Sequence, residues 1–160
     1  MDGRFVVSSK VGMGTQVDMF FPRADAPAWF LDTIYIQPNS EIYCLDDDLT
    51  IHQIWEGRLE GLRASQNNIE INSFTSAIEF KKFVSLLPID KNTKRIFLID
   101  YELLGQATTG LEVINELGLQ ENVVLVTSHY EEPEIQSKCE KLKIKLLPKS
   151  LAGFVPMVGV

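Results

Sequence analysis

The feature that most constrains the fold is a set of short, uninterrupted apolar runs that each end in a polar side chain. Residues 96–99 form one such run, which follows Lys94 and Arg95 and leads directly into Asp100. A run this short and this apolar is typical of a strand buried on both faces, as in a parallel sheet. Ligands of open parallel sheets lie at the carboxyl ends of the strands, so Asp100 is predicted at a functional edge. Taken alone, Asp100 could equally be a turn residue or a helix N-cap.

A second apolar run, residues 42–45, leads into Asp46, Asp47 and Asp48. If the two strands are parallel neighbours, Asp46, Asp47 and Asp100 converge at one edge of the sheet. Two carboxylates about 4 Å apart repel each other by roughly 4 kcal/mol at an effective dielectric constant of about 20, so the cluster needs a cation. Hard oxygen ligands without histidine or thiolate suit Mg2+. Asp48 is predicted to cap the following helix instead.

Two further runs complete a candidate site. Residues 123–126 end in Thr127 and Ser128, and residues 144–148 end in Lys149. A carboxylate cluster, a metal, a hydroxyl and a lysine together suit the handling of a phosphoryl group.

With these residues in place, the chain resembles a response-regulator receiver domain over roughly residues 41–158. In that family a double acid follows the first strand, and the phosphoacceptor aspartate ends the third. A threonine or serine ends the fourth strand, and a lysine ends the fifth. The resemblance implies a doubly wound α/β fold with a five-stranded parallel sheet in the flavodoxin-like order 2-1-3-4-5, and the alternation of strand and helix patterns agrees with it.

The resemblance also implies a chemistry. Asp100 is expected to accept a phosphoryl group from a phosphohistidine, and the domain is expected to have self-phosphorylating and dephosphorylating activity. Mg2+ would be held by Asp47 and Asp100, with support from Asp46 and the backbone carbonyl of Glu102. Lys149 would pair with the phosphoryl group and Thr127 would hydrogen-bond it.

Three positions depart from the family pattern. Ser150 follows Lys149 where proline is usual, Leu146 stands where many relatives have a switch aromatic, and Leu104 replaces a proline ahead of a longer loop. Two residues past Asp100 and Thr127 lie Glu102 and His129. They are interpreted either as solvated loop residues or as a salt-bridged lid over the site.

The first 23 residues form a separate pattern. Residues 4–8 and 16–21 read as two strands around a glycine-containing turn, which predicts a β-hairpin. The G-x-G-T element between them resembles the last strands of a histidine-kinase ATP-binding domain. Together with a following receiver this suggests the C-terminus of a hybrid sensor histidine kinase. The other nucleotide-binding boxes lie outside this chain, so ATP binding is not expected.

The predicted organisation is therefore a kinase-domain remnant at 1–23, a linker at 24–40 and a receiver domain at 41–160. The linker carries Trp29, Phe30 and Tyr35, too much apolar surface for a flexible tether. We expect part of it either to dock on the receiver or to pack on absent kinase domains. A lone hairpin is marginal in water, so residues 4–21 are expected either to pair with a second copy of the chain in a homodimer or to pack on the receiver with Trp29 and Phe30.

Charge and cysteine content limit the partners. A net charge of −7 argues against direct nucleic-acid binding. Cys44 and Cys139 give no disulfide framework, so a reduced, cytoplasmic setting is expected, and this fragment is expected to make no membrane contact. The expected partners are the phosphohistidine domain of a histidine kinase and a downstream histidine phosphotransfer protein.

Helical spacing predicts the remaining elements. His52 and Arg58 are expected on the solvated face of the first helix. Ser76 with Glu79 and Thr109 with Glu112 predict two capping boxes, and Pro133 suits the first turn of the fourth helix. A short last helix is expected from Ser150; its predicted apolar residues are Leu151, Phe154, Val155 and Met157.

Three rival functions stay open. A haloacid-dehalogenase-type phosphatase also uses an aspartate nucleophile, but it needs an aspartate where this chain has Glu102. A pseudo-receiver that acts only as a docking module is the main alternative. The third is a fragment whose activity is the kinase ATPase, which the missing nucleotide boxes disfavour.

Overall fold

The computed structural model describes residues 3–63, 68–88 and 93–160. Its centre is a five-stranded sheet in which every neighbouring pair of strands is parallel, in the order β5-β4-β6-β7-β8. This is the predicted order 2-1-3-4-5. The strands are β4 (Ser40–Leu45), β5 (Glu70–Phe74), β6 (Lys94–Asp100), β7 (Val123–Thr127) and β8 (Lys145–Pro148). The sequence predicts a turn from Pro88 to Thr93 ahead of β6, and most of it, residues 89–92, lies outside the described part of the chain.

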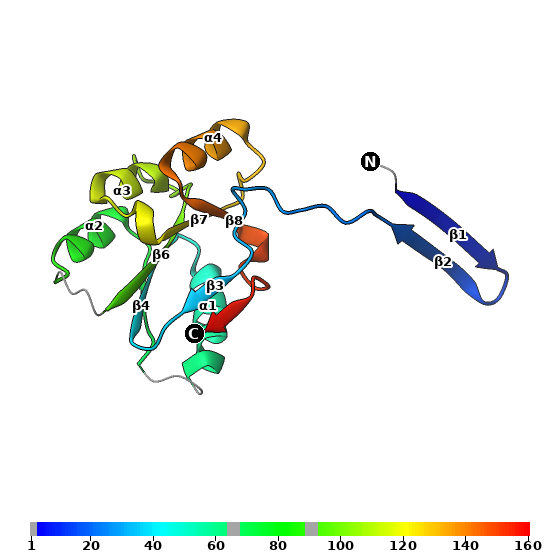
Figure 1. The fold of residues 1–160 in the computed structure, drawn as a ribbon, viewed down its shortest axis with the longest axis horizontal. Helices are drawn as coiled ribbons and strands as arrows, with labels where there is room; N and C mark the ends of the chain where they lie inside the picture. The colour runs from blue at the N-terminus through cyan, green and yellow to red at the C-terminus, as the bar shows by residue number, and fades with distance from the viewer. Residues whose placement is uncertain (1–2, 64–67, 89–92) are drawn as a thin grey trace.

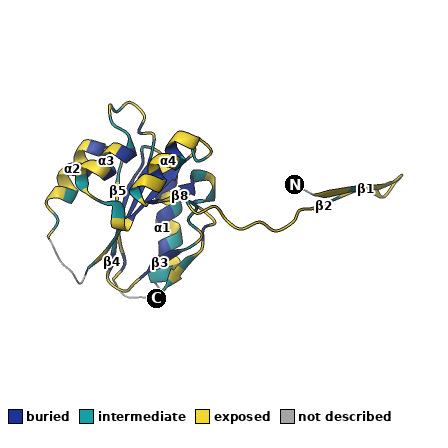
Figure 2. Cartoon of the chain, turned by 45° about the horizontal axis from the view of Figure 1, so that its top comes forward, coloured by how far each residue is buried: buried dark blue, intermediate teal, exposed yellow. Residues whose placement is uncertain are grey.

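Helices cover both faces of this sheet (Figures 1 and 2). On one face, Phe80, Ile114 and Ile135 bring three helices into a shared apolar cluster with β6 and β7. On the other face, Trp55 and Leu59 pack a single helix against β4 and β6. The helices are α1 (Leu49–Arg63), α2 (Ala77–Ser85), α3 (Gly110–Leu117) and α4 (Pro133–Leu142), with short 3-10 turns at η1 (Gln120–Asn122) and η2 (Lys149–Leu151). None of the described helices is both long and apolar enough to cross a membrane.

The helix starts follow the local sequence signals. The Asp48 carboxylate accepts from the Thr50 N–H at 2.8 Å, as predicted for a cap. Ser76 accepts from the Glu79 N–H, one of the two bonds of its predicted box. The box at Thr109 is complete, and Pro133 occupies the first turn of α4. Each cap satisfies N–H groups that the helix itself leaves unpaired.

The segment before β4 packs onto the domain, so the structure shows the first of the two alternatives given for the linker. The Leu146 N–H donates to the Trp29 carbonyl at 2.9 Å, and the Leu31 N–H donates to the Leu146 carbonyl at 3.0 Å. A short strand, β3 (Ile34–Ile36), then pairs in parallel with β9 (Met157–Gly159). The buried side chains of Ile34 and Ile36 join the apolar cluster around α1.

The predicted last helix is wrong. After η2 the chain forms a turn and then the strand β9. Pro156 lacks the N–H that a continuing helix needs. Its carbonyl accepts from the Ile34 N–H at 2.8 Å instead.

Arg58 was expected on the solvated face of α1, and that expectation is wrong because the C-terminal segment contacts its side chain. Its Nε donates to the Met157 sulfur at 3.2 Å, and its guanidinium also donates to the Val155 carbonyl. The chain end thus supplies partners for a side chain almost a hundred residues away.

The N-terminal residues form the predicted antiparallel hairpin of β1 (Arg4–Lys10) and β2 (Gly14–Phe20). Gly12 and Gly14 have φ values of 79° and 95°, which glycine adopts without steric cost and which allow the tight turn. Phe5 faces Met19 and Val7 faces Val17 across the pair, and all four side chains are exposed. An exposed stretch, residues 21–28, leads from the hairpin to the domain (Figure 1).

Candidate functional site

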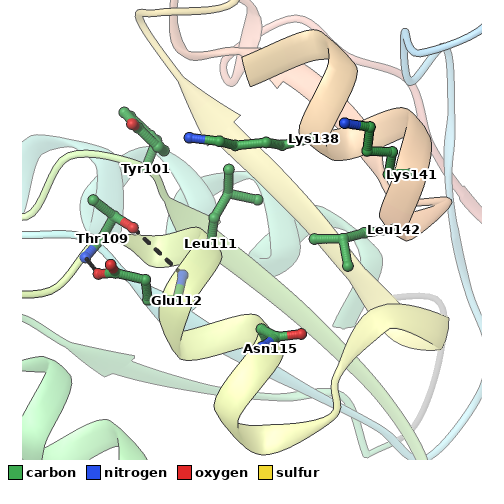
Figure 3. Close-up of a pocket in the computed structure, with 8 residues that line it drawn as sticks. All are labelled: Tyr101, Thr109, Leu111, Glu112, Asn115, Lys138, Lys141 and Leu142. Atoms are coloured by element: carbon green, nitrogen blue, oxygen red, sulfur yellow. Dashed lines mark hydrogen bonds between the residues drawn. The ribbon is translucent and has the colours of Figure 1, made fainter. Parts of the chain in front are cut away.

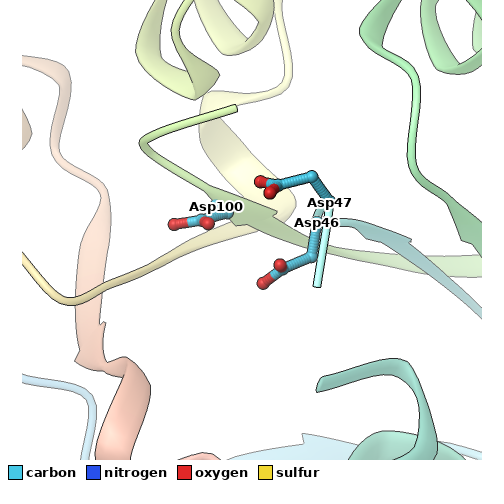
Figure 4. A group of neighbouring side chains, drawn as sticks. All are labelled: Asp46, Asp47 and Asp100. Atoms are coloured by element: carbon cyan, nitrogen blue, oxygen red, sulfur yellow. The ribbon is translucent and has the colours of Figure 1, made fainter. Parts of the chain in front are cut away.

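Three carboxylates meet at the carboxyl edge of the sheet. Asp46 and Asp47 follow β4, and Asp100 ends β6, the strand that pairs with β4. One oxygen from each carboxylate lies within 4.8 Å of the others. Figure 4 shows the three side chains gathered where the two strands end. The structure therefore brings together the acids that the strand-end pattern placed at one edge.

Lys149 supplies the positive charge of the site. Its Nζ donates to Asp100 Oδ2 at 2.6 Å and to Asp46 Oδ1 at 2.9 Å. The described residues contain no cis peptide bond, so the lysine reaches both acids from a trans backbone before Ser150. Three acids against one lysine leave an excess of negative charge when all are ionised.

Burial sets the protonation behaviour of the two inner acids. Asp100 is 4 % exposed, and loss of solvation raises its pKa to about 6 although Lys149 acts in the opposite direction. Burial also raises the pKa of Asp46 against the opposing bonds from Lys149 and the Asp48 N–H. Burial lowers the pKa of Lys149, but the two carboxylates more than offset this and the net shift is upward. The lysine stays charged while its acid partners protonate more readily than usual.

The donor set fits a hard divalent cation. Asp46 Oδ2 is buried and has no hydrogen-bond partner among the described residues. A buried carboxylate oxygen without a partner is costly, and a bound cation would satisfy it. Within residues 3–63, 68–88 and 93–160, the hydrogen bond of Asp47 Oδ1 is a long one, 3.4 Å from the Leu104 N–H. Asp46, Asp47 and Asp100 can therefore hold a divalent metal ion.

A hollow of about 150 Å³ opens beside the acids. The sequence-predicted residues Asp47, Asp100, Glu102 and Lys149 all line it. Thr127 does not: its side chain is fully buried, and its hydroxyl accepts from the His129 N–H at 3.0 Å. Ser128 lines the hollow instead. In this structure Thr127 holds the turn after β7, and the neighbouring serine presents the accessible hydroxyl.

His129 joins the two loops that border the hollow. Its Nε2 lies 3.0 Å from Glu102 Oε2, and its Nδ1 lies 2.6 Å from Glu132 Oε1. The bonds to Glu102 and then Glu132 raise the pKa of His129. Its ring also meets Tyr101 edge-on at 5.8 Å between centroids. Of the two interpretations given to Glu102 and His129, the geometry favours the salt-bridged lid.

His52 was expected in solvent, and that expectation is wrong. The imidazole is buried, and its Nε2 lies 2.6 Å from the backbone oxygen of Asp46. A carbonyl can only accept, so Nε2 carries the proton and donates. Because α1 begins directly after the acid turn, its second turn brings His52 back against the end of β4. The His52 side chain therefore stabilises the backbone turn that carries Asp46 and Asp47.

Gly110, which sequence reasoning missed, allows α3 to start against the end of β6. Its N–H donates to the Tyr101 carbonyl at 2.9 Å. A Cβ at this position would lie 1.9 Å from the Asp100 backbone oxygen, far inside contact distance. Only glycine fits this close approach. The sequence signal was a glycine directly after the Thr109 cap.

A larger hollow of about 570 Å³ lies between α3 and α4 (Figure 3). The buried Leu111 and half-buried Leu142 line it, together with the exposed Lys138 and Lys141. Tyr101 borders it, so the groove begins one residue after Asp100. It contains no cluster of potential metal ligands among the described residues, and the acid cluster lies outside it.

The order of strands and the acid–lysine edge define a class of protein, the flavodoxin-like α/β domains with a metal-binding acid cluster. No family model matches the sequence. No curated protein matches it either.

Solved structures narrow the class. The receiver domain of the histidine kinase CKI1 from Arabidopsis thaliana, complexed with Mg2+ and BeF3-, is similar with a TM-score of 0.53, 16 % identity and coverage of 71 % of this chain and 83 % of that one. The Salmonella typhimurium response regulator RcsB is similar with a TM-score of 0.55 and 16 % identity, over 72 % of this chain and 55 % of that one. The Mn(2+)-bound response regulator Rcp1 is similar with a TM-score of 0.50 and 16 % identity, over 71 % of this chain and 92 % of that one. The chain therefore has the fold of response-regulator receiver domains.

Proposed function

We propose that this chain is the phosphoacceptor domain of a two-component phosphorelay, in which Asp100 takes a phosphoryl group from a phosphohistidine. The observation that carries the proposal is the ion pair between Lys149 and Asp100, beside Asp46 and Asp47 at the carboxyl edge of the sheet. This arrangement offers a nucleophilic oxygen, a fixed cation and a metal site within one small hollow. The similar structures that contain Mg2+ with BeF3-, or Mn(2+), support the same reading.

In the proposed reaction a carboxylate oxygen of Asp100 forms a bond to phosphorus. The phosphorus–nitrogen bond of the donor histidine breaks, and its electron pair stays on the imidazole. Lys149 lies where it can pair with the transferred oxygens. Asp46 and Asp47, together with Asp100, would hold Mg2+, with the Glu102 carbonyl as the remaining protein ligand by resemblance to receivers. When bound, Mg2+ neutralises charge on the phosphoryl oxygens.

Labelling with a small phosphodonor tests this function. Wild-type protein incubated with acetyl phosphate and Mg2+ is expected to gain the mass of one phosphoryl group, and Asp100→Asn is expected to gain none. Asp48→Asn is the matched control: Asp48 lies in the same acid turn and borders the hollow, but its carboxylate caps α1 and is not one of the three clustered carboxylates. It should label like wild type. No labelling of the wild type would favour the alternative, a pseudo-receiver that only docks a protein partner.

The lid formed by Glu102 and His129 should affect the lifetime of the phosphoryl group more than its uptake. We expect Glu102→Gln and His129→Gln to speed hydrolysis by no more than about fivefold, since an exposed pair is worth at most about 1 kcal/mol. The reason is easier access of water to the acyl phosphate. Loss of label is measured after the donor is removed. Glu134→Gln, which breaks an ion pair farther along α4, is the control. Equal effects on uptake and loss would contradict the lid.

We also propose that residues 1–23 are the end of a histidine-kinase ATP-binding domain, so that the parent protein is a hybrid kinase with this receiver in the cytoplasm. A phosphohistidine domain would then be the donor, and a histidine phosphotransfer protein a downstream acceptor. The acidic net charge supports protein partners over nucleic acid.

The hairpin is the candidate homodimer contact. Phe5, Val7, Val17 and Met19 form an exposed apolar face on it. We expect deletion of residues 1–23 to give a monomer that still binds Mg2+ and still accepts a phosphoryl group. Light scattering on the full chain and on the truncation measures this. A dimer that survives the truncation would place the contact on the α/β domain instead.

A further inference from the structure

The strand that carries the site lysine is bound along its outer edge by the segment ahead of β3. This segment, residues 28–31, is called the docked segment below. Leu146 in β8 uses both its N–H and its carbonyl to bond Trp29 and Leu31. Phe30 forms a parallel bridge with the same Leu146, and the Lys145 Nζ donates to the Ala28 carbonyl at 2.6 Å. The docked segment therefore extends the central sheet beyond β8.

Its side chains contact both apolar layers of the domain. Trp29 packs on the cluster that contains Leu146 and the α4 residues Ile135 and Cys139. Leu31 packs on the opposite cluster, with Leu147. All three large side chains of the docked segment are only half-buried, and residues 21–27 before it are exposed. The docked segment thus joins an exposed part of the chain directly to β8.

The other end of β8 is joined to the phosphoacceptor. Lys149 follows the strand directly and bonds Asp100 and Asp46. A phosphoryl group on Asp100 would replace a single carboxylate charge by nearly two, displaced outward along the new bond. The oxygens that Lys149 bonds would therefore change in position and in charge. Leu146, whose backbone groups hold the docked segment, lies three residues before this lysine on the same short strand.

We propose that the docked segment is the output element of this domain: the phosphoryl state of Asp100 changes how Trp29 packs on β8 and on the adjoining apolar cluster, and residues 21–27 pass that change toward the hairpin. This inference rests on the proposed function. The coupling is carried by the backbone of the four-residue strand β8, which the docked segment bonds at Leu146 and which leads directly into Lys149 in the site.

Linkage gives the proposal a quantitative consequence. Suppose that a bound phosphoryl analogue changes the equilibrium constant for docking of Trp29. Docking of Trp29 must then change the affinity for the analogue by the same factor, so removing the Trp29 contact should change that affinity. Couplings of this kind typically amount to about 5-fold to 150-fold in affinity. A segment that served only as a static cover would leave the affinity for the analogue unchanged.

The chain has two tryptophans, Trp29 in the docked segment and Trp55 in the core, so fluorotryptophan labelling gives two resonances. The Trp29→Phe variant assigns them. The labelled protein is titrated with Mg2+ alone and then with beryllofluoride, a phosphoryl analogue whose bound fluorines appear in the same spectrum. We expect the Trp29 resonance to move when the analogue binds and the Trp55 resonance to move much less.

The affinity for beryllofluoride is then measured in Trp29→Ala and in Tyr35→Ala. Tyr35 is the matched control: it is an exposed aromatic in the next segment, but its backbone pairs with β9. We expect a change of at least about fivefold for Trp29→Ala and less than about twofold for Tyr35→Ala. The Trp55 resonance verifies that each variant is folded.

The outcomes separate the two claims. Absence of any bound beryllofluoride signal in the wild type would overturn the proposed function. Bound analogue with an unmoved Trp29 resonance, or with equal affinity in wild type and Trp29→Ala, would leave the proposed function intact and overturn the output role of the docked segment.

Discussion

Replacing Gly110 by alanine is expected to lower the free energy of unfolding by about 3 kcal/mol or more, at the upper end of overpacking effects. The added methyl would lie 1.9 Å from the Asp100 backbone oxygen and 2.8 Å from a side-chain carbon of Ile99. Neither a backbone oxygen nor a buried isoleucine can move aside cheaply, so the start of α3 must lift off the end of β6. Urea denaturation of the metal-free protein measures the loss.

The same substitution should also reduce phosphoryl uptake in whatever fraction stays folded, because the shift acts directly on Asp100. Gly57→Ala is the control. Gly57 lies inside α1, and a Cβ there would meet nothing within 4 Å. Alanine in a helix interior is favoured over glycine by up to about 1 kcal/mol, so this variant should be slightly stabilised. Similar stability of the two variants would show that α3 does not need the close approach at Gly110.

The metal-free protein is expected to become less stable as the pH rises through the window from about 4 to about 6. Asp100 has a pKa of about 6 in the folded state, against the ordinary aspartate value of 3.8 in the unfolded chain. Within that window the folded protein holds a proton that the unfolded chain has lost, so acidification favours folding. Asp46 shifts in the same direction. A difference of about two pKa units at roughly 1.4 kcal/mol each bounds the contribution of Asp100 at roughly 3 kcal/mol.

The comparison of wild type with Asp100→Asn isolates this contribution. Exposed acids whose pKa is lowered, such as Asp48 and Glu112, act in the opposite direction but are common to both proteins. In EDTA, the variant should be more stable than wild type near neutral pH, and the difference should disappear by about pH 4. A difference that did not depend on pH would contradict the raised pKa of Asp100.

Mg2+ should reverse this trend in the wild type, because the ion needs ionised ligands and stabilises the state that binds it. Millimolar Mg2+ is therefore expected to raise the melting temperature, most strongly above the pKa of Asp100. Asp47→Ala should abolish that rise and should itself stabilise the metal-free protein by removing one repelling charge. An unchanged response to Mg2+ in Asp47→Ala would show that Asp47 is not a ligand.

The parts of the site that could be predicted are those that local sequence determines. A buried strand ends where its apolar run ends, so the polar residues that follow, among them Asp46, Asp100 and Lys149, had to lie at one edge once the sheet was parallel. The Thr109 box and the Asp48 cap depend on residues at most three positions apart. The hairpin likewise follows from its own glycines and alternating pattern.

The parts that could not be predicted depend on partners far away in the sequence. The apolar spacing at Leu151, Phe154 and Val155 suits a helix, and only the arrival of β3 makes a strand at 157–159. Arg58 finds its acceptors in that same chain end. The buried position of His52 requires the angle at which α1 leaves the acid turn. The orientation of the Thr127 hydroxyl depends on the backbone of the β7–α4 loop, which residue type alone does not determine.

The docking of residues 29–31 and β3 has a consequence for how this domain could be exchanged between proteins. A recombination junction placed directly before Ser40 would discard Ile34 and Ile36, which are 4 % and 0 % exposed, and would leave β9 without its pairing strand. A junction within residues 22–27, which are exposed throughout, would cut no buried contact. The transferable unit therefore begins ahead of its first central strand, and any new domain joined to it would inherit the Trp29 attachment to β8.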